Sequence, residues 1–141
     1  MGRLYSTGPV ENAAANAGIS ALVKILNNSA NEVNVQLKLF SLNGLKQEVD
    51  STALVVAASS SDYYPFEVTN IIEYEIQIAT DSENDVLFSV WGLDADGNFI
   101  AAQRFVHKEL SQIVSQEVNL TTPKKKILTT KKSRRRATGT S

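Results

Sequence analysis

The chain has 141 residues, no cysteine and a formal net charge of −1. Its length fits a single domain, and the missing cysteines exclude disulfides, thiolate metal sites and thiol nucleophiles. The small total charge hides two opposed regions: residues 1–122 contain six basic and fifteen acidic residues, a net of −9, whereas residues 123–141 carry +8. We therefore expect an acidic body followed by a basic arm that is too highly charged to be buried.

Residues 1–18 lack the pattern of a core element. Leu4 and Tyr5 are large apolar side chains near the start, Gly8-Pro9 interrupts regular structure, and residues 11–18 form a spacer rich in Ala and Asn. The spacer is either one helical turn or a flexible link. We assign residues 1–18 to a connector outside the domain.

The start of the chain gives no sign of export. No apolar run follows Arg3, and no stretch of the chain approaches the roughly 18 apolar residues of a membrane span. The pattern Met1-Gly2-x-x-x-Ser6 matches N-myristoylation, but so short a pattern often occurs by chance. We expect synthesis in the cytoplasm without a signal peptide, and no membrane partner.

From Ile19 onward the apolar residues recur with a period of two, which is typical of half-buried β-strands. The strands are expected over residues 19–26, 33–39, 45–49, 53–57, 63–68, 71–79, 86–93 and 99–107. Asn43-Gly44 predicts a hairpin with a type I′ turn, because both central residues of that turn need positive φ. Residues 108–120 form either a closing strand or a short helix over 109–116.

Short strands at this spacing, without crossover helices, exclude a parallel α/β fold. We predict an all-β fold: an antiparallel β-sandwich of jelly-roll or Greek-key type over residues 19–120. An extended N-terminal connector precedes it, and a basic tail over residues 121–141 follows it.

The sequence offers little for catalysis. His107 is the only histidine, and neither Ser89 nor Ser111 lies in the Gly-x-Ser-x-Gly turn that exposes a nucleophilic serine. Glu73 and Glu75 lie on one face of a strand, which we expect to be solvated rather than catalytic. We predict that the protein is not an enzyme and holds no cofactor.

A second acidic motif resembles a calcium loop. Asp94-x-Asp96-Gly97-Asn98 places glycine fourth and Phe105 twelfth, whereas an EF-hand loop needs glycine sixth and glutamate twelfth. We interpret this segment as a hairpin turn and predict no metal site.

Trp91 lies on the opposite face of its strand from Phe88 and Val90, together with Leu87 and Leu93. The outer face of a two-layer sandwich is normally polar. Either this strand is buried on both faces, or Trp91 belongs to a contact between subunits, where aromatic residues are enriched.

The basic tail needs an anionic partner. Its charged residues are Lys124, Lys125, Lys126, Lys131, Lys132, Arg134, Arg135 and Arg136. No aromatic side chains are interleaved with them, so any nucleic-acid binding would be electrostatic and non-specific. The acidic body of a neighbouring copy is the other anionic partner that we expect.

The N-terminal peptide Met1-Gly2-Arg3-Leu4-Tyr5-Ser6-Thr7-Gly8-Pro9, followed by a spacer and a compact β-domain, resembles the subunits of endospore appendages, the pilus-like fibres on bacterial spores. Val90-Trp91-Gly92-Leu93-Asp94-Ala95-Asp96-Gly97-Asn98 and Gln103-Arg104-Phe105-Val106-His107 are similar to the late hairpin of such small jelly-roll proteins. The resemblance covers residues 1 to about 115. The chain departs from the family in having no cysteines and in its basic tail.

The resemblance implies a self-assembling structural subunit on the spore surface, whose N-terminal connector docks noncovalently into the next copy. Arg3, Leu4 and Tyr5 would be the docking residues, and Gly8 and Pro9 would set the reach and angle of the connector. The partners would be further copies in a helical fibre and an anchoring protein on the spore. The alternative is a polyanion-binding, nucleic-acid-binding or capsid-like domain that acts through its basic tail.

Overall fold

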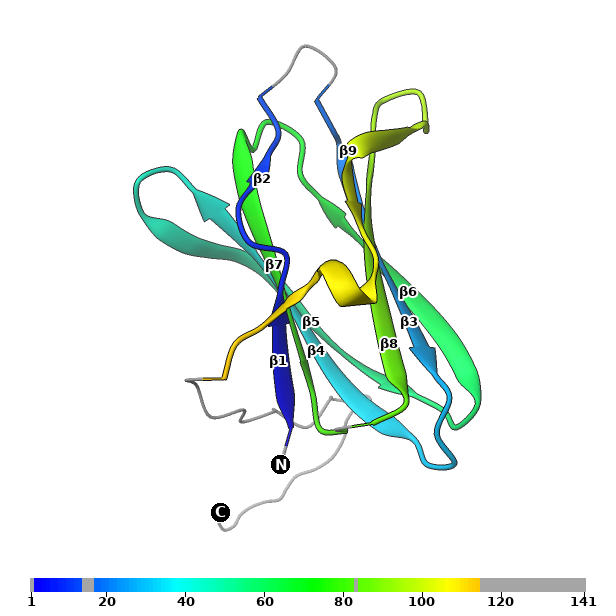
Figure 1. Cartoon of the computed structure of the whole chain (residues 1–141). Helices are drawn as coiled ribbons and strands as arrows, with labels where there is room; N and C mark the ends of the chain where they lie inside the picture. Colours follow the sequence, from blue (N-terminus) through cyan, green and yellow to red (C-terminus); the bar gives the residue numbers. More distant parts are fainter. Residues whose placement is uncertain (1, 14–16, 83, 115–141) are drawn as a thin grey trace, which may run out of the picture.

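The computed structural model describes residues 2–13, 17–82 and 84–114, and in it two antiparallel sheets pack face to face (Figure 1). The strands are β1 (Arg3–Ser6), β2 (Val10–Glu11), β3 (Ser20–Asn27), β4 (Val33–Leu42), β5 (Lys46–Val56), β6 (Ser60–Glu67), β7 (Glu73–Thr80), β8 (Val86–Leu93), β9 (Phe99–Phe105) and β10 (Ser111–Gln112). A single 3-10 turn, η1 (His107–Glu109), precedes β10. The predicted antiparallel β-sandwich is confirmed, and its jelly-roll connectivity stays a prediction.

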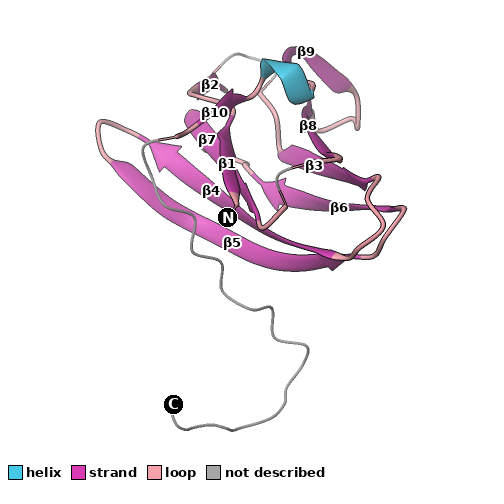
Figure 2. Cartoon of the chain, turned by 60° about the horizontal axis from the view of Figure 1, so that its bottom comes forward, coloured by secondary structure: helices cyan, strands magenta, loops and turns pink. Residues whose placement is uncertain are grey.

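The six-stranded sheet has the order β10-β1-β7-β4-β5, with β2 also paired to β7, and the four-stranded sheet has the order β6-β3-β8-β9. Only β4–β5 and β8–β9 are hairpins within one sheet. All the remaining connections between β3 and β9 cross from one sheet to the other (Figure 2). The crossings bring strands that are far apart in sequence into contact, so most of the packing is non-local.

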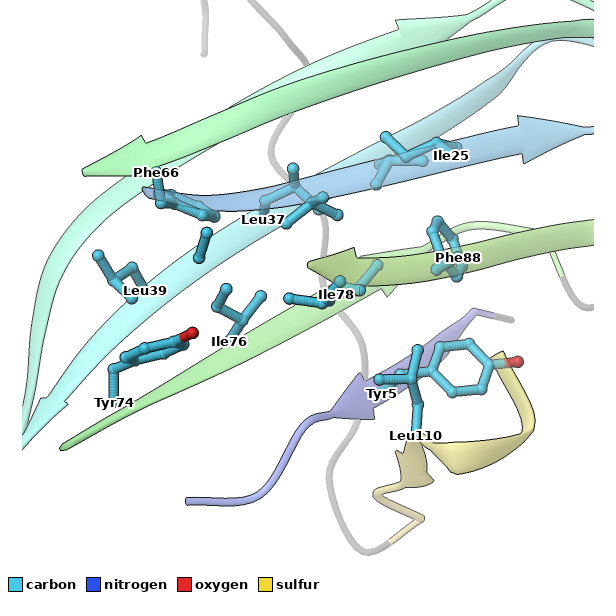
Figure 3. Close-up of a cluster of buried hydrophobic side chains, with 14 of the residues drawn as sticks. Tyr5, Ile25, Leu37, Leu39, Phe66, Tyr74, Ile76, Ile78, Phe88 and Leu110 are labelled. Atoms are coloured by element: carbon cyan, nitrogen blue, oxygen red, sulfur yellow. The ribbon is translucent and has the colours of Figure 1, made fainter. Parts of the chain in front are cut away.

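The core lies between the two sheets and follows the period of two (Figure 3). In β3 the side chains of Ala21, Val23 and Ile25 point inward, and in β4 the inward side chains start at Val33 and end at Leu39. These residues are almost fully buried. Burial of a large aliphatic side chain stabilises the fold by about 1.5–3 kcal/mol, so the alternating strands hold the sandwich together.

The expected domain boundary at residue 18 is wrong, because the N-terminal segment is part of the sandwich. β1 pairs with β7 along its whole length and with β10 through Tyr5 and Ser6. Leu4 and Tyr5 are 8% and 7% exposed, and the Tyr5 ring packs against Phe88 with centroids 5.7 Å apart. A four-residue strand is too short to show a period of two, and its partners lie late in the sequence.

Two further expectations on β4 and β5 are corrected. Residues 45–49 and 53–57 form one strand, β5, because the polar residues 50–52 continue the pairing with β4 on an exposed edge. The hairpin at Asn43-Gly44 is confirmed, but its turn is not type I′: the connection has three residues, 43–45, and only Gly44 has positive φ, at 80°.

The region from residue 108 onward is partly described. Residues 107–109 form η1 and Ser111–Gln112 form β10, so a short closing strand is present, and no α-helix starts at Glu109. Residues 115–120, with Val118, and the basic tail lie outside the described residues.

One end of the sandwich is closed by a buried polar network around Gln103. Its Nε2 donates to Asn12 Oδ1 at 2.8 Å and to the Glu11 carbonyl at 3.0 Å, and its Oε1 accepts from the Tyr74 hydroxyl at 3.0 Å. Gly92 makes room for this side chain: a Cβ on Gly92 would lie 2.1 Å from Gln103 Oε1. The network joins β2, β7 and β9, and it requires glycine at residue 92.

Candidate functional site

The outer face of the four-stranded sheet carries apolar side chains in register across its strands. Leu26 on β3 lies beside Leu87 on β8, and Leu22 lies beside Trp91. We call this surface the apolar face, and its residues are Leu22, Leu26, Tyr63, Leu87, Trp91, Leu93 and Phe99. Leu26 is 41% exposed, Leu87 43% and Tyr63 63%. Contiguous exposed apolar residues of this kind mark interaction sites on soluble proteins.

A groove of about 950 Å³ crosses one half of the apolar face. It runs from β6 over β3 and β8 to η1, and its lining includes Lys24, Leu26, Ser61, Tyr63, Leu87, Ser89, His107 and Lys108. β9 pairs with β8 only from Val90 to Leu93, so the first half of β8 has no strand on that side. The groove therefore has an apolar floor, and η1 lies where a longer β9 would continue.

Basic side chains gather around the apolar face. Lys24 and Lys108 line the groove, and the guanidinium of Arg104 lies 5.8 Å from the Trp91 ring centroid, within reach of a cation–π interaction. Neither lysine has an ion-pair partner among residues 2–13, 17–82 and 84–114. Residues 1–122 contain only six basic residues. Asp62 also lines the groove, so lysines outnumber acidic residues there by two to one. An apolar floor with this excess of positive charge favours a partner that is both apolar and anionic.

His107 holds η1 against the free edge of β8. Its Nδ1 accepts a hydrogen bond from the Phe88 backbone N–H at 3.1 Å, and its ring packs edge-on against Tyr5 with centroids 5.0 Å apart. Burial lowers the pKa of His107, and the nearby charge of Arg3 lowers it further. The folded protein thus favours the neutral imidazole, whose Nδ1 accepts the hydrogen bond from Phe88.

The outer face of the six-stranded sheet is polar, and its polar side chains contact one another; we call it the closed face. Glu75 accepts hydrogen bonds from Ser6 Oγ at 2.5 Å and Gln77 Nε2 at 3.1 Å, and Lys46 Nζ lies 3.1 Å from its other oxygen. Lys46 also lies 4.4 Å from the Phe40 ring centroid. The solvated carboxylate face expected at Glu73 and Glu75 is therefore wrong for Glu75, which is only 8% exposed.

The pKa of Glu75 is set by two opposing causes. Burial raises it, but the hydrogen bonds from Ser6, Gln77 and Lys46, with the charge of Lys46, outweigh burial, and the pKa falls below its ordinary value of 4.5. The carboxylate is therefore ionised over the physiological range, and it acts as the hub of this polar cluster.

The predicted site residues lie in three places. Arg3, Leu4 and Tyr5 are in β1; Gly8, with φ of 70°, and the exposed Pro9 connect β1 to β2. Trp91 is half-buried on the apolar face, where its Nε1 donates to Ser89 Oγ at 2.8 Å. No described element covers the outer face of β8. Within the described chain β8 is therefore not buried on both faces, and the contact between subunits stays a prediction.

The acidic motif at residues 94–98 is a hairpin turn, as predicted. Asp94 Oδ1 accepts from the backbone N–H of Asp96 and of Asn98, and Gly97 has φ of 81°. Among the described residues no three His, Asp or Glu side chains are grouped so as to hold a metal ion.

The groove could not be predicted from the sequence, although Leu87, Trp91 and Leu93 signalled a second apolar face.

Comparisons with protein-family models, with curated proteins and with solved structures found no match to this chain. Within the described ranges, no helix is both long and apolar enough to cross a membrane.

Proposed function

We propose that the protein is a structural, self-assembling subunit that polymerises by placing its N-terminal strand β1 in the sandwich of a neighbouring copy. The observation that carries the proposal is the position of β1. It starts the chain, yet its hydrogen-bonding partners are β7 and β10, and its Tyr5 packs against Phe88 and His107. All of these contacts are equally available from the same elements of a second copy.

The segment between β1 and β3 supports exchange. β2 lies in this segment and pairs with β7, so it would exchange together with β1. The hinge would then be residues 13–19, which contain Ile19 as their only large apolar side chain. Exchange of an identical element between copies is a route of low free-energy cost to oligomers, because the contacts formed equal those lost. A head-to-tail exchange that does not close into a ring makes a filament. The location on a spore and the anchoring protein remain predictions of the resemblance.

The basic tail carries a second candidate function, the binding of polyanions. Its support is the charge of +8 in residues 123–141 against −9 in residues 1–122. If the tail neutralises neighbouring acidic bodies, deleting residues 123–141 should slow assembly at 0.01 M salt and matter little at 1 M, since the Debye length shortens from about 30 to about 3 Å. Tail-dependent tight binding of DNA, with assembly unaffected, would favour the second candidate.

A cross-strand disulfide tests the exchange of β1. Ser6 and Gln77 are paired across β1 and β7, and paired positions of antiparallel strands lie within the Cα range of a disulfide. The chain has no other cysteine. Oxidised S6C/Q77C in assembled material should give a ladder of covalent multimers on a non-reducing gel. A mixture of the S6C and Q77C single variants should give covalent heterodimers.

A band at monomer mass only, from assembled S6C/Q77C, would overturn the exchange. The matched control is the L45C single variant, whose cysteine lies outside β1 and β7. It should give no ladder beyond dimers under the same oxidation.

A further inference from the structure

We propose that the groove on the apolar face binds the β4–β5 hairpin of a second copy of this chain, as a contact separate from the exchange of β1. The groove is concave, apolar and flanked by lysines without partners in the described chain. The hairpin is a projecting, apolar and acidic element of the same molecule. The inference rests on the proposed function only in making the partner another copy.

The hairpin projects beyond the sandwich (Figure 1, Figure 2). β4 pairs with β7 as far as Ser41, so Leu42, the connection 43–45 and Lys46 extend past β7, and β5 pairs with β4 alone. The first six residues of β5 are exposed. At the tip Leu45 is 81% exposed, and Val49, which has no cross-strand partner at a β-bulge, is 47% exposed. The fold itself therefore leaves these two side chains in water.

The dimensions of the two surfaces agree. At about 3.4 Å per residue, the segment from Leu45 to Val49 spans roughly 13 Å. The groove crosses from β6 over β3 to β8, which is two strand spacings, and η1 adds a third. At about 4.8 Å per spacing, the groove spans roughly 14 Å. One extended arm of the hairpin can thus cover the floor formed by Leu26 and Leu87.

Charge selects the hairpin over a second apolar face. Two apolar faces stacked about a twofold axis would bring Lys24 and Lys108 toward the lysines of the partner. The exposed part of β5 instead contains two acidic residues, Glu48 and Asp50, and one lysine, Lys46, which is paired with Glu75 of its own chain at 3.1 Å. Asp50 has no ion pair among the described residues, and Glu48 pairs with Lys38 on the exposed surface at 3.4 Å. Opposite charges at the rim of an apolar contact favour the correct partner and disfavour stacking.

The contact joins two different surfaces, so it can repeat from copy to copy without closing. It would add a second line of contacts to a fibre that exchanges β1. It would also persist between copies in which β1 stays in its own sandwich.

Cysteine pairing in the full-length chain tests the contact. Equimolar L45C and L87C proteins, mixed and oxidised mildly, should form a covalent heterodimer whose linked peptides mass spectrometry identifies. The control replaces L45C by I72C, which places cysteine at an apolar side chain of 56% exposure outside both surfaces. We expect at least about tenfold more heterodimer with L45C than with I72C, since a formed contact raises the effective concentration of the thiols.

Equal yields from L45C and I72C, or an L87C–L87C dimer as the main product, would overturn the proposal; the latter would indicate stacking of two apolar faces. The oxidised S6C/Q77C monomer separates this contact from the exchange of β1, because its β1 is locked in place. Its residual association in sedimentation velocity should be lost on adding Leu87→Ser. A locked monomer that never associates would overturn the proposal but not the exchange.

Discussion

The two outer faces of the sandwich differ in how far their side chains are satisfied within one chain. On the six-stranded sheet, Glu75 is surrounded by Ser6, Gln77 and Lys46, and Lys38 pairs with Glu48. On the four-stranded sheet, Leu26, Tyr63 and Leu87 are exposed beside lysines that have no ion pair in the described chain. The polar side chains of the first face are paired within one chain, whereas the exposed apolar side chains of the second face would gain contacts only from a partner.

Stability and association can therefore be separated by position. Substitutions on the closed face remove contacts that the folded chain already has. Substitutions on the apolar face remove contacts that form only on assembly. Substitutions in the core that the two sheets share should affect both properties.

The largest effect is expected from Gly92→Ala in the shared core. The added Cβ would lie 2.1 Å from Gln103 Oε1 and 2.7 Å from Gln103 Cβ, so β8 and β9 must separate or the network must break. Overpacking of this kind destabilises by about 3 kcal/mol. Chemical denaturation measures the loss. Gly18→Ala is the matched control, because its nearest contacts would be 3.1–3.3 Å; an equal loss in both variants would contradict this account.

A smaller effect is expected from Glu75→Ala on the closed face. It leaves Ser6, Gln77 and Lys46 without their common acceptor, and the loss of such charged hydrogen bonds costs about 2 kcal/mol. Because the folded state lowers the pKa of Glu75, its contribution is present above pH 4.5 and is lost as the pH falls through the lowered value. The denaturation midpoints of the variant and the wild type should therefore differ at pH 7 and converge at acid pH.

Leu87→Ser on the apolar face is the counterpart of Glu75→Ala. Leu87 is 43% exposed, so the free energy of unfolding should change by no more than about 0.5 kcal/mol. Association, measured by sedimentation velocity, should fall while the denaturation midpoint stays in place. A large loss of stability with unchanged association would remove the distinction between the two faces.

The smallest effect is expected from His107, at the edge of the groove. The folded state lowers its pKa, so its contribution to stability is complete above pH 6.5 and declines as the pH falls through the lowered value. His107→Asn keeps an acceptor for the Phe88 N–H but does not titrate there. The variant should lose part of the pH dependence of stability below pH 6.5, and an unchanged pH profile would argue against this role.

Much of the fold could be predicted, because it follows from local patterns. The period of two predicted β3 and β4 as strands, and Val23, Ile25 and Leu37 lie on their buried faces. β1 could not be predicted, since its four residues become a strand only through β7 and β10. The same limit applied to the groove, which depends on the register of three strands and on a short β9. Leu87, Trp91 and Leu93 were the local sign of the apolar face.

β1 pairs with β10, which is made long after it, and this bears on synthesis. Tyr5 and Ser6 pair with Gln112 and Ser111, close to the end of the described chain. At about 5–20 residues per second, β1 would be synthesised roughly 5–20 s before β10. Neighbouring ribosomes on one messenger hold other unfinished copies. β1 thus lacks its β10 partner for most of the time in which the described chain is made, and nascent chains on one polysome would have that interval in which to exchange β1.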